Sequence, residues 1–306
     1  MSPARLLCVG ALTLDTIFKL ERLPAGSGKF IPEAAVQIAA GMAASAAASA
    51  SRQGGKVSLW ASVGDDPAAA ELLSQMEGEG VDCSAVRRVA GGRSAFASIL
   101  VDAVGERMIV PYYDPMTQEE PAFLPFDDFS DFDAVLVDVR WPGAAALALE
   151  QASRDNIAGI LDADVAPRSV LDRLFPLASH VVASQPAATA ICGRELEAAE
   201  AVGQLARRTN AFVAVTDGAN GTFWYDSAKA SVRHVPAPKV TAVDTLAAGD
   251  VFHGCFALAV AEGCEIERGL RFASVAAAIK CQRFGGRLGA PSRRETLAFM
   301  ESCDEL

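Results

Sequence analysis

Short apolar runs alternate with helical stretches along most of the chain. The clearest runs are residues 5–10, 57–63, 134–139, 157–162, 179–183 and 212–216. A run that is apolar throughout is typical of a strand buried on both faces, and such strands separated by helices form parallel sheets. The pattern therefore predicts an α/β fold, in which a mainly parallel sheet is covered by helices on both faces.

Two early regions do not follow this alternation. Residues 94–101 and 107–112 are extended runs joined by the turn sequence "DAVGE", which predicts a hairpin. Residues 13–20 form a further extended piece close to the N-terminus. Together these pieces predict a small second sheet that lies over one edge of the main sheet.

The C-terminal part is helical. Helices are predicted over residues 249–262, 265–283 and 292–302, and the last one opens with "SRRE", a capping box. The stretch "VDTLAAGD" (243–250) follows a strand-like segment and begins the first of these helices. No repeat or low-complexity linker divides the chain, so we expect one domain over residues 1–306.

The composition and charge of the chain exclude some classes of binding partner. The chain carries a formal net charge of −11 and no basic run, which argues against nucleic acid or an anionic membrane. A small anionic substrate is compatible with this charge only if it meets a local basic pocket. Seven cysteines without a C-x-x-C pair favour reduced thiols and therefore the cytoplasm. Three separated histidines make a zinc site improbable, and the sequence leaves the metal ligands unknown.

The stretch "VDTLAAGD" combines small residues with an acid at a helix start. The N–H groups of Ala247, Ala248 and Gly249 can point at one anion, assisted by the helix dipole. The carboxylate of Asp250 would be repelled by a bound phosphate, unless it takes a proton from an attacking hydroxyl. The stretch therefore indicates an anion hole beside a general base. The alternative is an aspartate that caps a closely packed helix.

Three further features are compatible with a ligand site at the carboxyl ends of the strands. The segment "VTDGANG" (215–221) follows a buried strand and could hold a nucleotide phosphate against bare backbone. The small residues around Gly41 begin another helix, where close packing is the alternative. Asp15 follows the first strand and could bind sugar hydroxyls, although an exposed turn acid fits equally well.

These motifs resemble one known family. "DTLAAGD" is similar to the D-T-x-G-A-G-D signature of the ribokinase-like (phosphofructokinase-B type) carbohydrate kinases. "GALTLD", the stretch around Gly41, "VGDD" and "VTDGANG" occur in the order that this family uses. The resemblance implies a Rossmann-like sheet with a small β-sheet lid, here residues of about 12–35 and 93–113. It also implies transfer of a phosphoryl group from ATP, with Mg²⁺, to a sugar hydroxyl.

The resemblance assigns roles to individual residues. It implies that Asp250 is the base and that Ala247, Ala248 and Gly249 form the anion hole. The positions that match ATP contacts are Thr216, Gly218 and Gly221. The positions that match sugar contacts are Asp15, Gly41 and Ser45.

The chain departs from the family pattern at several positions. Ala247 replaces a glycine, so we expect the anion hole to form if Ala247 keeps a negative φ. Ser45 replaces an asparagine, and "SQPA" (184–187) replaces an N-x-x-E motif that is tied to magnesium and phosphate. K⁺ dependence occurs in the family, and no residue pattern here decides it.

Longer segments are similar to one branch of the family, the sulfofructose kinases, which phosphorylate 6-deoxy-6-sulfofructose at its 1-hydroxyl. These segments are "LPAGSGK", "VDVRW", "DVFHG" and "KCQRFGGRLGAP". Lys29 and Arg140 are candidate cations for a sulfonate, because arginine offers such a group two parallel N–H donors. The alternatives are a solvated lysine and a surface ion-pair partner. Pro111, in a lid strand, has no N–H for the substrate.

Other functions are compatible with these residues. Within the family, the competing activities are fructokinase, ribokinase, 2-keto-3-deoxygluconate kinase and sugar-phosphate kinase. A dehydrogenase would share the sheet, but "GALTLD" lacks the G-x-G-x-x-G fingerprint. A non-catalytic sugar-binding regulator is the third class. Because a lid made of strands has exposed edges, we also expect a homodimer through the lid.

Overall fold

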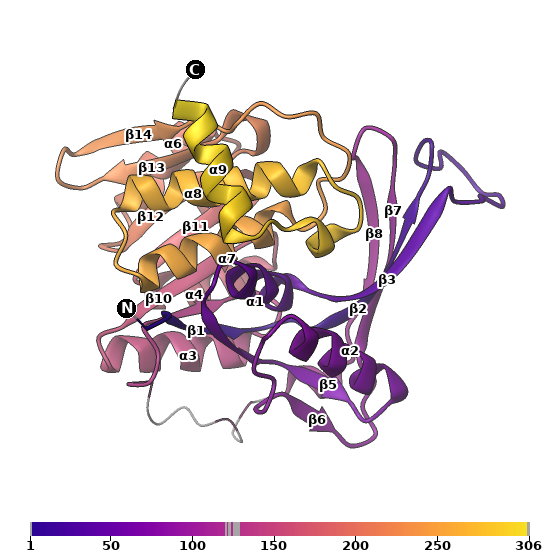
Figure 1. Ribbon diagram of the computed structural model, residues 1–306. Helices are drawn as coiled ribbons and strands as arrows, with labels where there is room; N and C mark the ends of the chain where they lie inside the picture. Colours follow the sequence, from indigo (N-terminus) through magenta and orange to yellow (C-terminus); the bar gives the residue numbers. More distant parts are fainter. Residues whose placement is uncertain (1, 120, 122–123, 125–128, 305–306) are drawn as a thin grey trace.

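The computed structural model describes residues 2–119, 121, 124 and 129–304. Its main sheet has the order β14-β13-β12-β11-β10-β9-β1-β4, and only the β12–β13 and β13–β14 pairs are antiparallel (Figure 1). The strands are β1 (Arg5–Val9), β4 (Lys56–Trp60), β9 (Ala134–Val137), β10 (Ala158–Ala163), β11 (His180–Ser184), β12 (Phe212–Thr216), β13 (Thr222–Asp226) and β14 (Ser231–Val235). The predicted α/β sheet is confirmed.

Helices cover both faces of this sheet, because alternate residues of its buried strands point to opposite sides. In β1, Leu7 packs with one layer of helices and Leu6 with the other. The first layer is α3 (Pro142–Arg154), α4 (Arg168–Leu174), α5 (Gln185–Cys192) and α6 (Ala198–Ala206). The second layer is α1 (Met42–Arg52), α7 (Ala248–Ala261) and α8 (Ile266–Cys281), with α9 (Arg293–Asp304) against α8.

The small residues of α1 allow a close approach to α7. A Cβ atom on Gly254 of α7 would lie 2.2 Å from the carbonyl oxygen of Ala46 in α1. No larger residue fits there without separating the two helices. This contact fixes α7, and with it the segment that precedes it, against α1.

A separate small sheet stands beside the main one, as the sequence predicted (Figure 1). Its order is β3 (Ala34–Ala40), β2 (Thr13–Lys19), β7 (Ala95–Val101) and β8 (Arg107–Tyr112). The sequence did not predict β3, because its alanines have a low strand propensity. The strand forms nevertheless, because it pairs with all seven residues of β2, from Thr13 to Lys19.

The run over residues 57–63 is two strands rather than the one predicted. It divides at Ala61 into β4 and β5 (Ser62–Gly64), and β5 pairs with β6 (Arg87–Val89) in a sheet of its own. Helix α2 (Pro67–Gly78) follows, with Asp66 as its N-cap. The loop predicted over residues 116–128 lies partly outside the described residues.

The C-terminal helices agree with the prediction. At the start of α9, the N–H and the hydroxyl group of Ser292 each donate to Glu295 Oε2 at 2.7 Å, which confirms the capping box. Short 3₁₀ helices complete the chain: η1 (Pro115–Gln118), η2 (Phe175–Leu177), η3 (Gly218–Asn220) and η4 (Gly286–Gly289). None of the helices described is long and apolar enough to cross a membrane.

Candidate functional site

The strand order of the main sheet reverses between β1 and β9, and this is where α/β sheets place ligands. Asp138 follows β9 directly and is buried. Its Oδ2 accepts from the N–H groups of Ala11 and Ala43 at 2.8 and 3.0 Å, and its Oδ1 accepts from Arg140 N at 2.7 Å. Asp138 therefore holds the end of β1, the start of α1 and Arg140 in one arrangement.

Carboxyl groups gather at this edge of the sheet. Asp250, in the first turn of α7, is partly buried. Its pKa is well above its ordinary value, because loss of solvent disfavours the charged form and because the negative charge of Asp162 adds to this. Burial also raises the pKa of Asp162 at the end of β10, and the charges of Asp164 and Asp138 add to this. A carboxylate with a raised pKa accepts a proton more readily, which is the property a general base needs.

His253 lies one turn after Asp250 and is buried. Its Nδ1 is 2.7 Å from the carbonyl oxygen of Gly249 and 3.3 Å from Asp162 Oδ2, and its Nε2 is 3.2 Å from the carbonyl oxygen of Val182. Burial lowers the pKa of His253, while these carbonyl groups act in the opposite direction. The ring thereby connects the start of α7 with the ends of β10 and β11.

Ala247 does not have the negative φ on which the expected anion hole was made conditional. Ala247 is the N-cap of α7 with φ 61° and ψ 11°, a left-handed conformation that costs an alanine about 1–2 kcal/mol. The chain needs this conformation to turn from Leu246 into the helix. The N–H of Ala248 donates to the carbonyl oxygen of Thr245 at 3.3 Å. Gly249 lies in the first turn of α7, where N–H groups have no partner inside the helix.

The residues expected to bind sugar lie between the small sheet and α1. Asp15, in β2, is 8% exposed and accepts from the Thr13 hydroxyl at 2.7 Å, and burial raises its pKa to about 6. Gly41 precedes α1 with φ 97°, and a Cβ atom there would lie 2.6 Å from the carbonyl oxygen of Ala11. Ser45 is buried, and its hydroxyl group has no hydrogen-bond partner among the described residues.

Tyr113 connects the two ends of this region. Burial raises the pKa of its phenol to about 12. Arg140 lowers this pKa, whereas Asp138, Asp15 and Asp250 raise it. The sugar candidate, the arginine candidate and the proposed base therefore lie within electrostatic reach of a single side chain.

The two candidate cations differ. Arg140 is partly exposed, and it donates to the carbonyl oxygen of Val165 at 2.9 Å and to Asp164 Oδ2 at 3.3 Å. It thus lies at the edge of the sheet, as predicted, but in an ion pair. Lys29 is exposed in the loop between β2 and β3, and it has no hydrogen bond or ion pair with the residues described. The structure does not bring Lys29 to the carboxyl cluster.

The residues expected to bind ATP lie further along the same edge. Thr216 ends β12 and pairs in register with Ser184 of β11, whose hydroxyl donates to Asp164 Oδ1 at 3.1 Å. Gly218 has φ 50° and Gly221 φ 92°, so both need the freedom of glycine. No atom lies within 4 Å of a Cβ atom built on Gly218, so its backbone is open to a ligand.

Sequence reasoning did not single out Tyr113, Asp138, Asp162, Asp164 and His253. The three acids do carry a signal, since each lies at or just after the end of a buried strand. Their mutual proximity depends on the strand order, which local patterns do not give. Among the residues described, no group of three or more His, Cys, Asp or Glu side chains is arranged to hold a metal.

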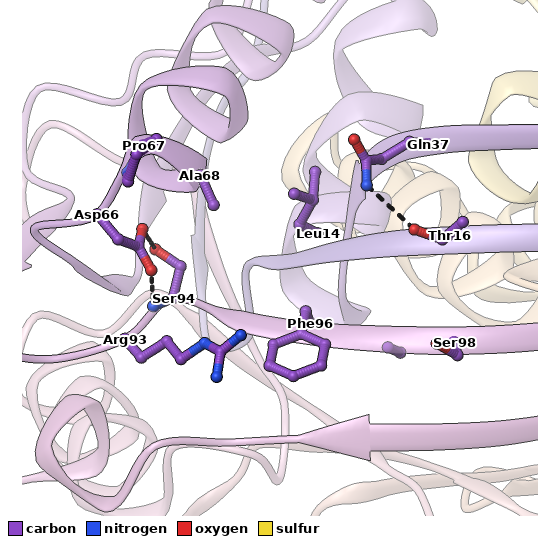
Figure 2. A pocket seen from close by; sticks show the side chains of 11 residues that line it. Leu14, Thr16, Gln37, Asp66, Pro67, Ala68, Arg93, Ser94, Phe96 and Ser98 are labelled. Carbon is purple, nitrogen blue, oxygen red and sulfur yellow. Dashed lines mark hydrogen bonds between the residues drawn. The ribbon is translucent and has the colours of Figure 1, made fainter.

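A cavity of about 340 Å³ lies elsewhere, between the small sheet and the start of α2 (Figure 2). Leu14 and Thr16 line it together with Phe96 and Ser98, their register partners in β7. Asp15 lies between Leu14 and Thr16 and therefore points to the opposite face of the sheet. This cavity is separate from the carboxyl cluster.

Comparison with known proteins decides the family. The sequence profile of the pfkB family carbohydrate kinases matches residues 3–293. The chain is a PfkB family carbohydrate kinase. The resemblance carried by "DTLAAGD" and its companion motifs is thereby confirmed at the level of the family. The open backbone at Gly218 and the carboxyl group of Asp250 at the start of α7, both at one edge of the sheet, also agree with a sugar kinase.

The relatives of this kinase carry several names. It is 28% identical to a ribokinase of Haemophilus influenzae, over 85% of this chain and 87% of that one. A solved structure from Agrobacterium tumefaciens, provisionally named a ribokinase, is 45% identical, with a TM-score of 0.95 and 99% of both chains covered. Ribokinase from Thermotoga maritima, at 24% identity, shares the fold with a TM-score of 0.82 over 98% of this chain and 99% of that one.

Proposed function

We propose that this kinase transfers the γ-phosphoryl group of ATP to an anionic sugar, best represented by the 1-hydroxyl of 6-deoxy-6-sulfofructose. Use of ATP is supported by the solved structure of an Arabidopsis thaliana ribokinase complexed with ribose and ATP, which is similar to this kinase. The observation that carries the anionic substrate is the position of Arg140. Its guanidinium is partly exposed at the carboxyl end of β9, next to Asp138 and within electrostatic reach of Tyr113.

In the proposed reaction, Asp250 accepts the proton of the sugar hydroxyl. The hydroxyl oxygen then forms a bond to the γ-phosphorus, and the bond from that phosphorus to the β-γ bridging oxygen breaks, so that ADP leaves. The raised pKa of Asp250 favours the proton transfer. The N–H groups of residues 247–249 would hold the negative charge of the migrating phosphoryl group, and that of Ala248 would exchange its 3.3 Å bond to the carbonyl oxygen of Thr245 for the phosphoryl oxygen.

Other residues of the edge would position the two substrates. Thr216 and Gly218 would hold the ATP phosphates, and Gly221, whose N–H donates to the carbonyl oxygen of Gly218, would hold the turn in shape. The small sheet would close over the sugar as a lid that carries Asp15. Mg²⁺ would neutralise phosphate charge during the transfer. The residues present fit this ion, because Asp162 and Asp164 offer carboxylate oxygens, which Mg²⁺ binds alongside substrate phosphates.

The recognition of a sulfonate would use Arg140 and Lys29. Arg140 already bonds to Asp164 and Val165, and its partly exposed guanidinium retains N–H donors for a second anion. Lys29 would join it only after a movement of its exposed loop, since the structure does not bring Lys29 to the carboxyl cluster. Ribokinase is the second candidate, because the ion pair with Asp164 satisfies Arg140 without any anionic substrate.

The test is ATP consumption with Mg²⁺ across sulfofructose, fructose, fructose 6-phosphate, ribose and 2-keto-3-deoxygluconate. We expect kcat/KM to be highest for sulfofructose and to fall by about 10–100-fold in Arg140→Ala, since a charged hydrogen bond contributes about 1.5–3 kcal/mol. Fructose turnover in that variant should change little. A preference for ribose that survives in Arg140→Ala would refute the anionic substrate but not the kinase chemistry.

We further propose that the kinase is a homodimer through the small sheet. The face of this sheet away from Asp15 is largely apolar, as the strand register shows. It carries Leu14, Phe18, Phe96, Leu100, Met108, Val110 and Tyr112. All six residues of β8 are exposed, and contiguous apolar surface of this kind marks interaction sites. A second copy would cover both this face and the free edge of β8.

A further inference from the structure

Lys280 is a cation inside the protein. It lies in the last turn of α8, and its side chain and that of Asp244 are both 0% exposed. Burial of a lysine ammonium is costly unless its hydrogen bonds are satisfied. Its partners therefore indicate what it does, and the proposed reaction makes no use of it.

Lys280 contacts two oxygens of one residue. Its Nζ lies 2.5 Å from the carbonyl oxygen of Asp244 and 3.4 Å from Asp244 Oδ1. A carbonyl oxygen and a carboxylate oxygen that converge on one buried point are the ligand types a monovalent cation also takes. In this protein, the lysine nitrogen occupies that point.

Both carboxylate oxygens of Asp244 and its backbone N–H make hydrogen bonds. Its Oδ1 accepts from Leu246 N at 2.8 Å, and its Oδ2 accepts from the N–H groups of Gly285 and Gly286 at 2.9 Å each. Its own N–H donates to the carbonyl oxygen of Cys281 at 3.1 Å. Asp244 thus joins the end of α8, the glycine turn after it and the segment that enters α7.

The segment from Asp244 to Gly249 is the proposed anion-hole segment. Its second residue, Thr245, donates its hydroxyl to the carbonyl oxygen of Gly105 and accepts from Arg107, both at 2.8 Å. Its fourth residue, Ala247, is held in a left-handed conformation. A change of position at Asp244 would therefore move N–H groups that must meet the phosphoryl oxygens.

We propose that Lys280 is a positioning residue, a built-in cation that holds the anion-hole segment through Asp244, so that phosphoryl transfer needs no dissolved monovalent cation. The inference rests on the proposed role of residues 247–249. Burial lowers the pKa of Lys280, whereas the charge of Asp244 and the hydrogen bond to it act in the opposite direction. The pKa of Lys280 stays below its ordinary value, so Asp244 offsets part of the cost of burying the ammonium group.

The first test uses the unaltered protein. Turnover with Mg²⁺ and the best sugar of the panel is measured in tetramethylammonium chloride and in potassium chloride at equal ionic strength. We expect the two kcat values to agree within about twofold, because the site already contains its cation. Activation by K⁺ of about tenfold or more would overturn the proposal, whatever the variants do.

The second test removes the cation. In Lys280→Met, we expect kcat to fall about 10²-fold with little change in KM for the sugar, because misplaced anion-hole donors affect the transition state. In Lys280→Ala, which leaves room for an ion, KCl or methylammonium chloride should restore part of kcat, and tetramethylammonium chloride should not. Lys239→Met, which removes an exposed lysine, is the control for net charge.

A merely structural role predicts a different result. It would lower the melting temperature of both Lys280 variants and would give no rescue that depends on the size of the ion. If neither variant folds, the measurement on the unaltered protein still decides. If no sugar is turned over, the proposed substrates fail, and the cation claim is tested by calorimetry of AMP-PNP binding. We expect equal affinities in the two salts, and a K⁺ requirement would refute the claim.

Discussion

Asp15→Asn should raise the unfolding free energy of the protein and also raise its KM for the sugar. Asp15 is 8% exposed, and burial raises its pKa from the ordinary 3.8 to about 6. Between these two values the folded protein binds more protons than the unfolded chain. The stability that this carboxyl group contributes is therefore complete below about pH 4, and it is lost as the pH rises through about 6.

The magnitude follows from the shift. A displacement of about two pKa units corresponds to about 3 kcal/mol at neutral pH, at about 1.4 kcal/mol per unit. Asparagine keeps the shape of the side chain and cannot ionise, so we expect Asp15→Asn to gain about 2–3 kcal/mol of unfolding free energy at pH 7.5. The gain should shrink as the pH falls toward 4.

Urea denaturation at pH 7.5 and pH 4.5 measures both effects. Asp65→Asn, which alters an exposed carboxyl group, is the matched control. Sugar kinetics complete the assay: KM should rise in Asp15→Asn, and in the unaltered enzyme it should rise as the pH falls below about 6. The reasoning is refuted if Asp15→Asn is no more stable than the unaltered protein at pH 7.5, or if the stability difference does not depend on pH.

Three further predictions concern the start of α7 and the small sheet. Asp250→Asn should fold and bind ATP but lose about 10²–10⁴ in kcat, and near-normal turnover would exclude Asp250 as the base. Ala247→Gly should raise the unfolding free energy by up to about 1 kcal/mol in thermal denaturation, because glycine adopts φ 61° without strain, and a lower melting temperature would contradict this. Val110→Asp places a charge on the exposed apolar face of the small sheet, so light scattering should detect monomers, whereas an unchanged mass would exclude this face as the dimer contact.

The sequence predicts the main sheet well because its strands are buried on both faces and therefore read as unbroken apolar runs. It does not predict β3, since Ala34–Ala40 becomes a strand only by pairing with β2. The division of the run 57–63 at Ala61 could not be predicted either, because it arises from the pairing of β5 with β6 outside the main sheet. Both differences arise from partners that are distant in the sequence.

The candidate site, too, could be predicted from the sequence only where it depends on a local motif. "VDTLAAGD" is a local motif, and it predicted the start of the helix, with Asp250 in its first turn. Asp138 and Asp162 join Asp250 only because β9 and β10 are neighbours in the sheet and α7 packs against both. The positive φ of Ala247 could not be predicted from the sequence, because the contacts that hold its segment outweigh the preference of alanine for negative φ.

The most direct measurement is identification of the product formed from ATP, Mg²⁺ and 6-deoxy-6-sulfofructose, by phosphorus–proton correlation spectroscopy. The proposal predicts stoichiometric ADP and a phosphate ester on the 1-hydroxyl, formed by the unaltered enzyme and not by Asp250→Asn. An ester on another hydroxyl, or a sulfofructose that stays intact while ribose is phosphorylated under the same conditions, would contradict it.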